Sequence, residues 1–285
     1  MTIKEAINQG IIMLKNENIE SPKVKARIIM QYTLKKTREY IIVYDNIEIT
    51  PNQRDEYVRN IKRLISGEPL QYITGVQEFM KLKFLVNKSV LIPRQDTEIL
   101  VEEVINIAKK GQKLEILDLC TGSGAIAISI AKFLPESKIT AIDISKEALE
   151  LAKKNAKFNR VQKNIEFIES DLFKKIHGRK FDIIVSNPPY IPTAQIKSLP
   201  KDVQNEPIIA LDGGKTGLEF YEKIIDEGYK YLKPNGNICL EIGYDQKVKV
   251  KKIIDNNNMY INTYCKKDLC ENDRVIVTTT ILGQV

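Results

Sequence analysis

Hydrophobic residues recur at helical spacing through the first 66 residues. Ile7, Ile11 and Leu14, for example, fall on one face of a helix. Four Ser or Thr residues stand where helix caps are expected, and two of them directly precede a proline. They are Thr2, Ser21, Thr37 and Thr50. The pattern predicts a small bundle of four or five helices whose apolar stripes pack against one another.

The pattern changes in residues 67–95, which we interpret as a linker and a β-hairpin. Apolar and polar residues alternate along residues 78–87, as in a strand or hairpin, and residues 90–94 form a short extended stretch. Asp96 then precedes apolar residues at helical spacing. We expect it to cap a helix that Gly111 ends.

From residue 113 onward, short apolar runs alternate with helical patterns. The expected strands cover residues 114–119, 138–142, 165–168, 181–185, 237–242, 259–264 and 274–281. The expected helices cover residues 123–133, 145–158, 218–232 and 245–255, and Pro234-Asn235-Gly236 is expected to stop the third. This alternation predicts an α/β fold with a doubly wound, mainly parallel seven-stranded sheet. The expected domains are residues 1–66, 67–95 and 96–285.

Composition narrows the class of protein. The 285 residues are 43% hydrophobic, enough for a sizeable core. No apolar run is long enough to cross a membrane, and the first residues lack the apolar stretch of a secretory signal. We therefore expect a cytoplasmic protein without a membrane partner.

The sequence gives little support for a metal site or for a catalytic histidine. The four cysteines show no CxxC spacing, and the single histidine, His177, lies in a polar stretch. A zinc site and a Ser-His-Asp or Cys-His mechanism are therefore disfavoured. The net charge of +7 shows no clustering along the chain, so direct binding to nucleic acid is not indicated.

The most informative stretch is residues 181–190, in which an apolar run ends in Asn187-Pro188-Pro189-Tyr190. The run is typical of a strand buried on both faces, and the two prolines would stop it in a stiff elbow. In open α/β sheets, ligands bind at the carboxyl ends of the strands.

This elbow offers the chemistry for alkylating a conjugated nitrogen. The side-chain oxygen of Asn187 and the proline carbonyls are acceptors that can hold both hydrogens of an NH2 group. The ring of Tyr190 would attract developing positive charge. The alternative is an ordinary Pro-Pro turn after a strand.

A loop with two glycines follows the first strand of the predicted sheet. It reads Cys120-Thr121-Gly122-Ser123-Gly124. The glycines allow a tight turn and a close approach of the backbone to a ligand. The pattern is not GxGxxG and contains no Walker lysine, which disfavours a pyrophosphate ligand.

Aspartates lie at the ends of the first three predicted strands. Asp118 could accept a hydrogen bond from an amino or cationic group, and Asp143 could bind both hydroxyls of a ribose. Asp171 could meet an adenine amino group, with the apolar Leu172 against the ring. Each could instead serve as a turn or cap residue. Together with the elbow, they favour S-adenosylmethionine as the cofactor, because this nucleoside carries no phosphate.

At this point the whole chain resembles a known family, the release-factor glutamine N5-methyltransferases, and its core resembles the class I S-adenosylmethionine-dependent methyltransferases. The resemblance covers essentially residues 1–283 and rests on the elbow and three further stretches. These are residues 67–75 with Glu78-Phe79, the stretch Leu91-Ile92-Pro93-Arg94-Gln95-Asp96-Thr97-Glu98, and residues 211–218 with Asp273-Arg274-Val275.

That family methylates the side-chain amide nitrogen of the glutamine in the Gly-Gly-Gln motif of bacterial peptide-chain release factors. The resemblance implies that Asn187 and Pro188 hold this amide and that Tyr190 flanks it. Other residues implied to bind the substrate are Pro189, Phe79 and Arg94. The helical domain, residues 1–66, would help to recognise the release factor.

The resemblance also implies that residues 120–124, Asp143, Leu172 and Asn187 line the cofactor. Two positions depart from the family pattern. Cys120 stands where glycine is frequent, and we expect an altered contact rather than lost binding. Asn272 also replaces a frequent glycine, and its tolerance of left-handed φ would preserve the turn.

The expected reaction is a direct displacement at the methyl carbon, which requires no metal and no nucleophilic side chain. The same site could instead methylate a glutamine of a ribosomal protein, or an adenine or guanine exocyclic amine in nucleic acid. A non-catalytic module that binds the translation apparatus is the alternative from a different class.

Overall fold

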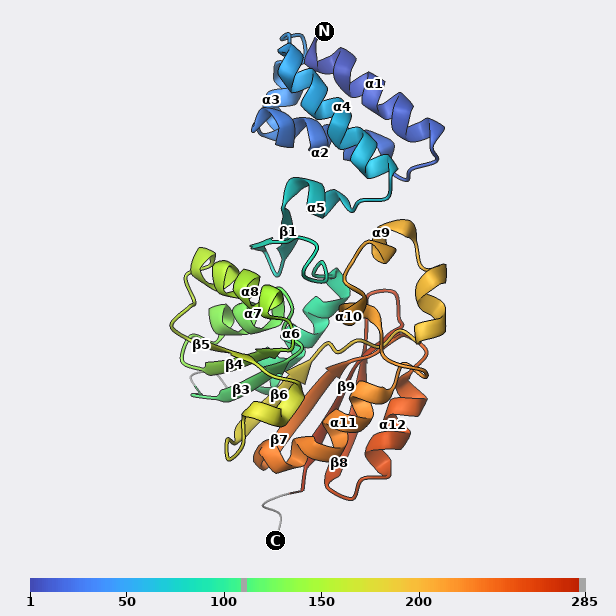
Figure 1. The fold of residues 1–285 in the computed structure, drawn as a ribbon. Helices are drawn as coiled ribbons and strands as arrows, with labels where there is room; N and C mark the ends of the chain where they lie inside the picture. The colour runs from blue at the N-terminus through green and yellow to red at the C-terminus, as the bar shows by residue number, and fades with distance from the viewer. Residues whose placement is uncertain (109–111, 282–285) are drawn as a thin grey trace. The chain divides into compact units, whose positions relative to one another are not determined.

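Figure 1 shows the fold as a computed structural model that describes residues 1–108 and 112–281. The chain forms two compact units. The first contains Met1–Val76 and Pro200–Asn205, and the second contains Gln77–Leu199 and the described residues from Glu206 onward. Gly111, the expected end of a helix, lies outside the described residues.

The first unit is helical. Its helices are α1 (Ile3–Asn16), α2 (Pro22–Leu34), α3 (Arg38–Val43), α4 (Pro51–Ile65), α5 (Leu70–Thr74) and α9 (Lys201–Gln204). Thr2, Thr37 and Thr50 cap α1, α3 and α4 as predicted, because each hydroxyl accepts a hydrogen bond from the backbone three residues on. Ser21 does not, since its left-handed φ of 51° leaves the side chain without a cap bond.

This unit has a hydrophobic core of its own. Ile29, Met30 and Ile61 are completely buried in it. Four helices within residues 1–66 agree with the sequence pattern. The sequence pattern did not predict α5, because five residues are too few to display a helical period.

The predicted hairpin is present as β1 (Val76–Phe79) and β2 (Leu82–Leu85). Met80 and Lys81 join the strands with φ angles of 51° and 59°. Two successive left-handed residues match the twist of the flanking strands in a two-residue hairpin.

The second unit is built on a seven-stranded sheet in the order β5-β4-β3-β6-β7-β9-β8. Its strands are β3 (Glu115–Leu119), β4 (Lys138–Asp143), β5 (Ile165–Glu169), β6 (Phe181–Ser186), β7 (Leu232–Glu241), β8 (Tyr260–Lys267) and β9 (Asp273–Thr280). Neighbours from β5 to β7 are parallel, whereas β9 is antiparallel to β7 and β8. The predicted doubly wound, mainly parallel sheet is confirmed.

Helices cover both faces of this sheet (Figure 1). The helices of the second unit are η1 (Gln95–Thr97), α6 (Glu98–Ile107), α7 (Ala125–Phe133), α8 (Lys146–Phe158), η2 (Leu172–Lys175), η3 (Thr193–Ser198), α10 (Ile208–Leu211), α11 (Glu219–Gly228), η4 (Tyr229–Tyr231) and α12 (Lys247–Asp255). Ile116 of β3 packs in a core with α6 and α7, and its neighbour Leu117 packs in a second core with α11 and α12. Burial on both faces accounts for the apolar runs along the strands.

Two expectations about element ends were wrong. Asp96 does not cap a helix: it lies within η1, and its carboxylate pairs with Arg274 at 3.2 Å. Pro234-Asn235-Gly236 does not stop a helix, because α11 and η4 end earlier and β7 runs through these residues. Asn235 has a φ of 60°, and the register with β6 is irregular near this point, so a bulge accommodates the turn-forming residues.

Candidate functional site

The site lies where the sheet reverses its winding, between β3 and β6. Strands β4 and β5 extend from β3 on one side, and β7 pairs with β6 on the other. Leu119 and Ser186 are register partners, and the Ser186 hydroxyl donates to the Leu119 carbonyl at 2.7 Å. This bond ties the start of the glycine-containing loop to the residue before Asn187. Crevices at such reversal points are the usual ligand sites of open α/β sheets.

A cavity of about 190 Å³ opens at the carboxyl ends of these strands, wholly within the second unit. Most residues predicted from the sequence line it. They are Arg94, Cys120, Thr121, Gly122, Ser123, Asp143, Asp171, Leu172, Asn187 and Pro189. The predicted residues outside the described lining are Phe79, Asp118, Gly124, Pro188 and Tyr190.

Asp143, the last residue of β4, lines the cavity and also holds the loop in place. One carboxylate oxygen accepts from the backbone of Gly122 at 2.8 Å, and the other accepts from Ser145 at 2.9 Å. Burial raises the pKa of this carboxyl, and these backbone hydrogen bonds oppose that shift. Each oxygen retains a lone pair for a ligand.

The two glycines of the loop have different roles. Gly122 lines the cavity with a φ of +55°, and no protein atom lies within 4 Å of where a Cβ would stand. Gly124 is buried with a φ of +80°, and a Cβ there would lie 2.9 Å from Ile128 and 3.1 Å from Ala152. Gly122 therefore leaves space for a ligand, whereas Gly124 allows α7 and α8 to pack closely.

Two other residues of the lining have strained backbones. Cys120 has a φ of 58° and Leu172 a φ of 46°. Left-handed φ is costly for residues with a Cβ, which explains why glycine suits the position of Cys120. Asn272, the second position that departs from the family pattern, does not have the left-handed φ that we expected. Glu271 has it instead (64°), and the side chain of Asn272 donates to the Asp268 carboxylate.

Asp118, predicted to meet a ligand, lies outside the described lining of the cavity. Its side chain is completely buried, and one oxygen accepts from the Thr121 hydroxyl at 2.6 Å and from the Ala127 backbone at 3.2 Å. The other oxygen has no hydrogen-bond partner among the described residues. Burial raises the pKa of Asp118 to about 7. Through these two hydrogen bonds Asp118 connects the glycine-containing loop to the first turn of α7.

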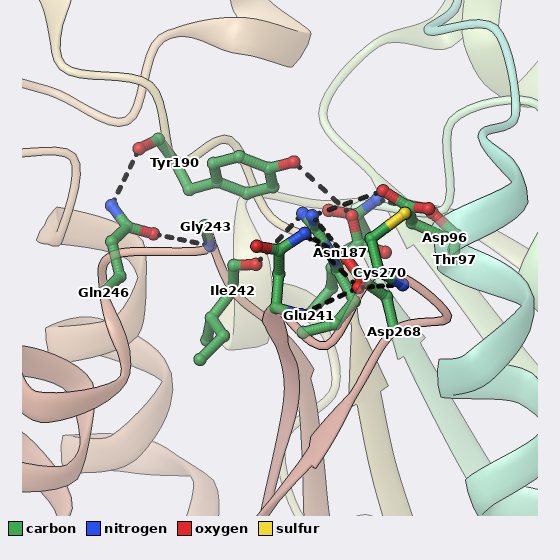
Figure 2. Close-up of polar contacts among 12 residues, drawn as sticks. Asp96, Thr97, Asn187, Tyr190, Glu241, Ile242, Gly243, Gln246, Asp268 and Cys270 are labelled. Carbon is green, nitrogen blue, oxygen red and sulfur yellow. Dashed lines mark hydrogen bonds and ion pairs between the residues drawn. The ribbon is translucent and has the colours of Figure 1, made fainter.

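Asn187 lies directly after β6, and its side chain has a defined orientation. The Nδ2 atom donates to the Thr97 hydroxyl at 3.2 Å (Figure 2). Because the nitrogen is engaged by Thr97, the side-chain oxygen remains as an acceptor. Pro188 is buried, and within residues 1–108 and 112–281 no backbone N–H donates to its carbonyl.

Tyr190 lies at the edge of the group of polar residues that Figure 2 shows together with Asn187. Its hydroxyl is 3.5 Å from a carboxylate oxygen of Glu241, and its carbonyl accepts from Gln246 at 3.0 Å. Burial raises the pKa of the phenol. Tyr190 is therefore held through its hydroxyl and through its backbone carbonyl.

The remaining two predicted residues have contrasting positions. Arg94 lines the cavity, and its guanidinium forms an ion pair with the buried carboxylate of Glu206. Phe79 lies outside the described lining of the cavity: it is completely buried and packs edge to face on Phe84. The assignment of Phe79 to substrate binding stays a prediction, to which its burial in the core of the second unit lends no support.

Sequence reasoning missed several residues of the lining. Ile144 lines the cavity and is half exposed, and Phe220 and Lys223 contribute from α11. Thr97 lines it as well. Ile144 could have been found, since it follows a strand-end aspartate. Phe220 and Lys223 carry no local signal, because their place depends on how α11 packs.

Two other features are absent from the described residues, a metal-binding cluster and a membrane-spanning helix. In residues 1–108 and 112–281, no group of three or more His, Cys, Asp or Glu side chains could hold a metal ion. Within the same ranges, every helix is too short or too polar to cross a membrane.

Comparison with known proteins identifies the family. Residues 95–268 match the family model "Methyltransferase small domain", and residues 5–75 match "PrmC N-terminal domain". A release factor glutamine methyltransferase from Moorella thermoacetica is 38% identical over 274 residues, which cover 96% of this chain and 97% of that protein. This chain belongs to the release factor glutamine methyltransferase family.

Other matches agree with this family. A release factor glutamine methyltransferase from Clostridium acetobutylicum is 40% identical over 280 residues, covering 97% of this chain and 98% of that protein. A solved methyltransferase from Pyrococcus furiosus shares the fold with a TM-score of 0.52 at 18% identity, covering 82% of this chain and all (100%) of that one. The chain therefore has a methyltransferase fold and is an enzyme of this family.

Proposed function

We propose that this enzyme transfers a methyl group from S-adenosylmethionine to the side-chain amide nitrogen of the glutamine in the Gly-Gly-Gln motif of bacterial peptide-chain release factors. Two relatives that match nearly the whole chain carry the name release factor glutamine methyltransferase. The observation that carries the proposal is the orientation of Asn187, whose nitrogen donates to Thr97 while its oxygen has no hydrogen-bond partner in residues 1–108 and 112–281.

The residues of the cavity fit S-adenosylmethionine. The Asp143 carboxylate would bind the ribose hydroxyls, and Asp171 would accept from the adenine amino group between the apolar side chains of Ile144 and Leu172. The open space at Gly122 would admit the cofactor against the loop backbone. When bound, this cofactor supplies a methyl carbon made electrophilic by its sulfonium.

The protein would prepare the glutamine nitrogen for attack. The oxygens of Asn187 and Pro188 would each accept one hydrogen of the amide NH2 group, which would draw the nitrogen out of conjugation with its carbonyl. Its lone pair would then point at the methyl carbon. Transfer would form the N–C bond while the C–S bond of the bound cofactor breaks, and the nitrogen would lose one proton to water. Positioning and electrostatic stabilisation by the fixed acceptors would supply the rate enhancement.

We assign release-factor recognition to the helical domain, residues 1–66. This domain has its own core, and its described residues contain no cluster of His, Cys, Asp and Glu side chains that could hold a metal ion. An open groove on it is lined by Arg54, Arg59, Lys62 and Arg63 of α4, with Asp55 as the one acid. Counting charges along the sequence had hidden this local cluster. We further propose that residues 67–95 link the domains, that residues 96–285 bind the cofactor and that the enzyme works in the cytoplasm, where translation terminates.

Mass spectrometry of a purified release factor before and after reaction tests the proposal. We expect one added methyl group, located on the glutamine of Gly-Gly-Gln, and none on a release factor in which that glutamine is replaced by alanine. Transfer of labelled methyl to ribosomal protein, RNA or DNA instead would identify a different substrate. Cofactor binding without any transfer would contradict an enzymatic role.

A further inference from the structure

Gln246, the residue before α12, carries a buried side-chain amide that is hydrogen-bonded to the elbow, residues 187–190. It is 4% exposed and lies outside the described lining of the cavity. Its Nε2 atom donates to the Tyr190 carbonyl at 3.0 Å (Figure 2) and to the Gly217 carbonyl at 3.2 Å. One buried side chain therefore joins two segments of the chain, one of which contains the proposed amide site.

The partners of Gln246 allow only one orientation of its amide. Oε1 accepts from the backbone nitrogen of Gly243 at 2.9 Å (Figure 2), and the Tyr221 hydroxyl lies 3.3 Å from it. A backbone N–H can only donate and a carbonyl can only accept, so the amide nitrogen must face Tyr190 and Gly217. The Gln246 backbone nitrogen donates in turn to the Gly243 carbonyl at 2.9 Å. This reciprocal pair fixes the side chain relative to the loop between β7 and α12.

The two segments that this amide joins also pair with each other. The Ile191 nitrogen donates to the Leu211 carbonyl at 3.0 Å, and the Ile191 carbonyl accepts from Gly213 at 2.9 Å. Residues 190–193 and residues 211–217 therefore lie side by side, and we call them the paired segments. The second of them belongs to a stretch that supported the family resemblance, and its pairing gives that stretch a structural role beside the elbow.

Glycines let the paired segments approach closely. A Cβ at Gly213 would stand 2.7 Å from the Tyr190 Cα and 2.8 Å from the Pro189 carbonyl oxygen. A Cβ at Gly217, whose φ is +74°, would stand 2.4 Å from the Tyr190 carbonyl oxygen. Because side chains do not tolerate such distances, these positions need glycine, and residues 211–217 pack directly on the backbone of the elbow.

Both paired segments continue into the wall of the cavity. Pro189 lines it next to the proposed acceptor Pro188, and Ile209 and Ala210 of α10 line it directly before residues 211–217. A shift of the paired segments would therefore move the acceptor carbonyl and this part of the wall together. Misplacing a reacting group by about 1 Å can lower a rate by about a hundred-fold, so the position of these segments matters for the chemistry.

We propose that Gln246 is a positioning residue that, by holding the Tyr190 and Gly217 carbonyls together, fixes the elbow where its acceptors meet the substrate amide. The inference rests on the proposed function, since it assigns those acceptors to the glutamine NH2 group. Gln246 contributes no atom to the reaction and acts through the backbone of the elbow. Without its amide nitrogen, the two carbonyls lose their shared donor and the paired segments loosen.

Two variants and one matched control test this. Gln246→Met keeps the length of the side chain and removes the donor. Gln246→Glu keeps an acceptor for Gly243 but places a second oxygen against the two carbonyls. The control is Asn164→Asp, which makes the same change in another amide that donates to two backbone carbonyls. Its partners are Pro135 at 2.8 Å and Ser137 at 3.3 Å, and all three residues lie outside the described lining of the cavity.

We expect Gln246→Met and Gln246→Glu to lower kcat about ten-fold or more, with KM for the release factor and Kd for S-adenosylmethionine within about two-fold of wild type. Asn164→Asp should keep all three constants near wild type. Rates are compared at a temperature at which each variant binds the cofactor fully, so that loss of folded enzyme does not lower kcat. A loss of kcat no larger than in Asn164→Asp, or an equal loss of cofactor affinity, would reduce Gln246 to a structural residue.

Hydrogen exchange on the cofactor-free protein separates this inference from the proposed function. The backbone amides of Ile191 and Gly213, which join the paired segments, should exchange at least about five-fold faster in Gln246→Met, whereas those of β3 and β4 should keep their wild-type rates. Unchanged exchange at both amides in the folded variant would overturn the inference. A wild-type enzyme that methylates no release factor would contradict the proposed function, whatever the exchange rates show.

Discussion

The carboxylate of Asp143 accepts a hydrogen bond from the backbone nitrogen of Gly122 at 2.8 Å, across 21 residues of sequence. One strand-end side chain therefore both faces the cavity and shapes the loop beside it. A change at Asp143 acts on a ligand contact and on the loop at once.

Asp143→Ala should weaken cofactor binding strongly and stability only slightly. We expect Kd for S-adenosylmethionine to rise more than about ten-fold, because a charged acceptor for two ribose hydroxyls is lost. The lost loop bonds should lower the free energy of unfolding by about 1 kcal/mol. Calorimetric titration and urea unfolding measure the two effects. Unchanged affinity in a folded variant would remove Asp143 from the cofactor site.

Cys120→Gly should stabilise the enzyme. Cys120 has a φ of 58°, and glycine adopts this conformation without the Cβ penalty. We expect a gain of about 1 kcal/mol in the free energy of unfolding. Cys120→Ala is the matched control, since it removes the thiol but keeps the Cβ, and it should bring no gain. A stabilised alanine variant would instead assign the effect to the thiol.

The stability of the enzyme should depend on pH through Asp118. Burial raises the pKa of this carboxyl from 3.8 to about 7. Between these values the folded chain holds a proton that the unfolded chain has released, so the stabilisation is complete below pH 4 and lost as pH rises through 7. Asp118→Asn imitates the neutral acid, and its free energy of unfolding should fall less between pH 5 and pH 8 than that of wild type. Equal slopes in urea titrations would contradict the raised pKa.

Charge reversal in the α4 groove should affect recognition of the substrate and not the chemistry. Arg59→Glu should raise KM for the release factor several-fold, because like charges slow encounter with an acidic partner surface. Its kcat and its affinity for S-adenosylmethionine should stay near wild type. Lys154→Glu makes the same charge change on the exposed side of α8 and should leave KM unchanged. Equal KM values for both variants would argue against this groove as the recognition surface.

Local sequence patterns predicted the strands, the glycine-containing loop and the elbow, residues 187–190. Apolar runs mark β3 to β6. Because the carboxyl ends of parallel strands meet at one edge of the sheet, the sequence predicted that Gly122, Asp143 and Asn187 lie close together. The burial of individual side chains was harder to predict from the sequence. Phe79 and Asp118 face inward because of how distant elements pack.

Hydrogen bonds between residues far apart in the chain could not be predicted from the sequence. Thr97 and Asn187 are 90 residues apart, and nothing in either segment specifies their hydrogen bond. Glu241 lies in an apolar strand end that resembles any other strand of the core. Such contacts depend on how elements far apart in the sequence pack, which no local pattern encodes.

The most direct test of the account is the rate of methyl transfer by Asn187→Ala on an intact release factor, measured by mass spectrometry at saturating cofactor. We predict that kcat falls at least about a hundred-fold, because the main acceptor for the amide NH2 group is lost, while Kd for S-adenosylmethionine changes far less. A folded Asn187→Ala enzyme with near-normal kcat would contradict the proposed mechanism.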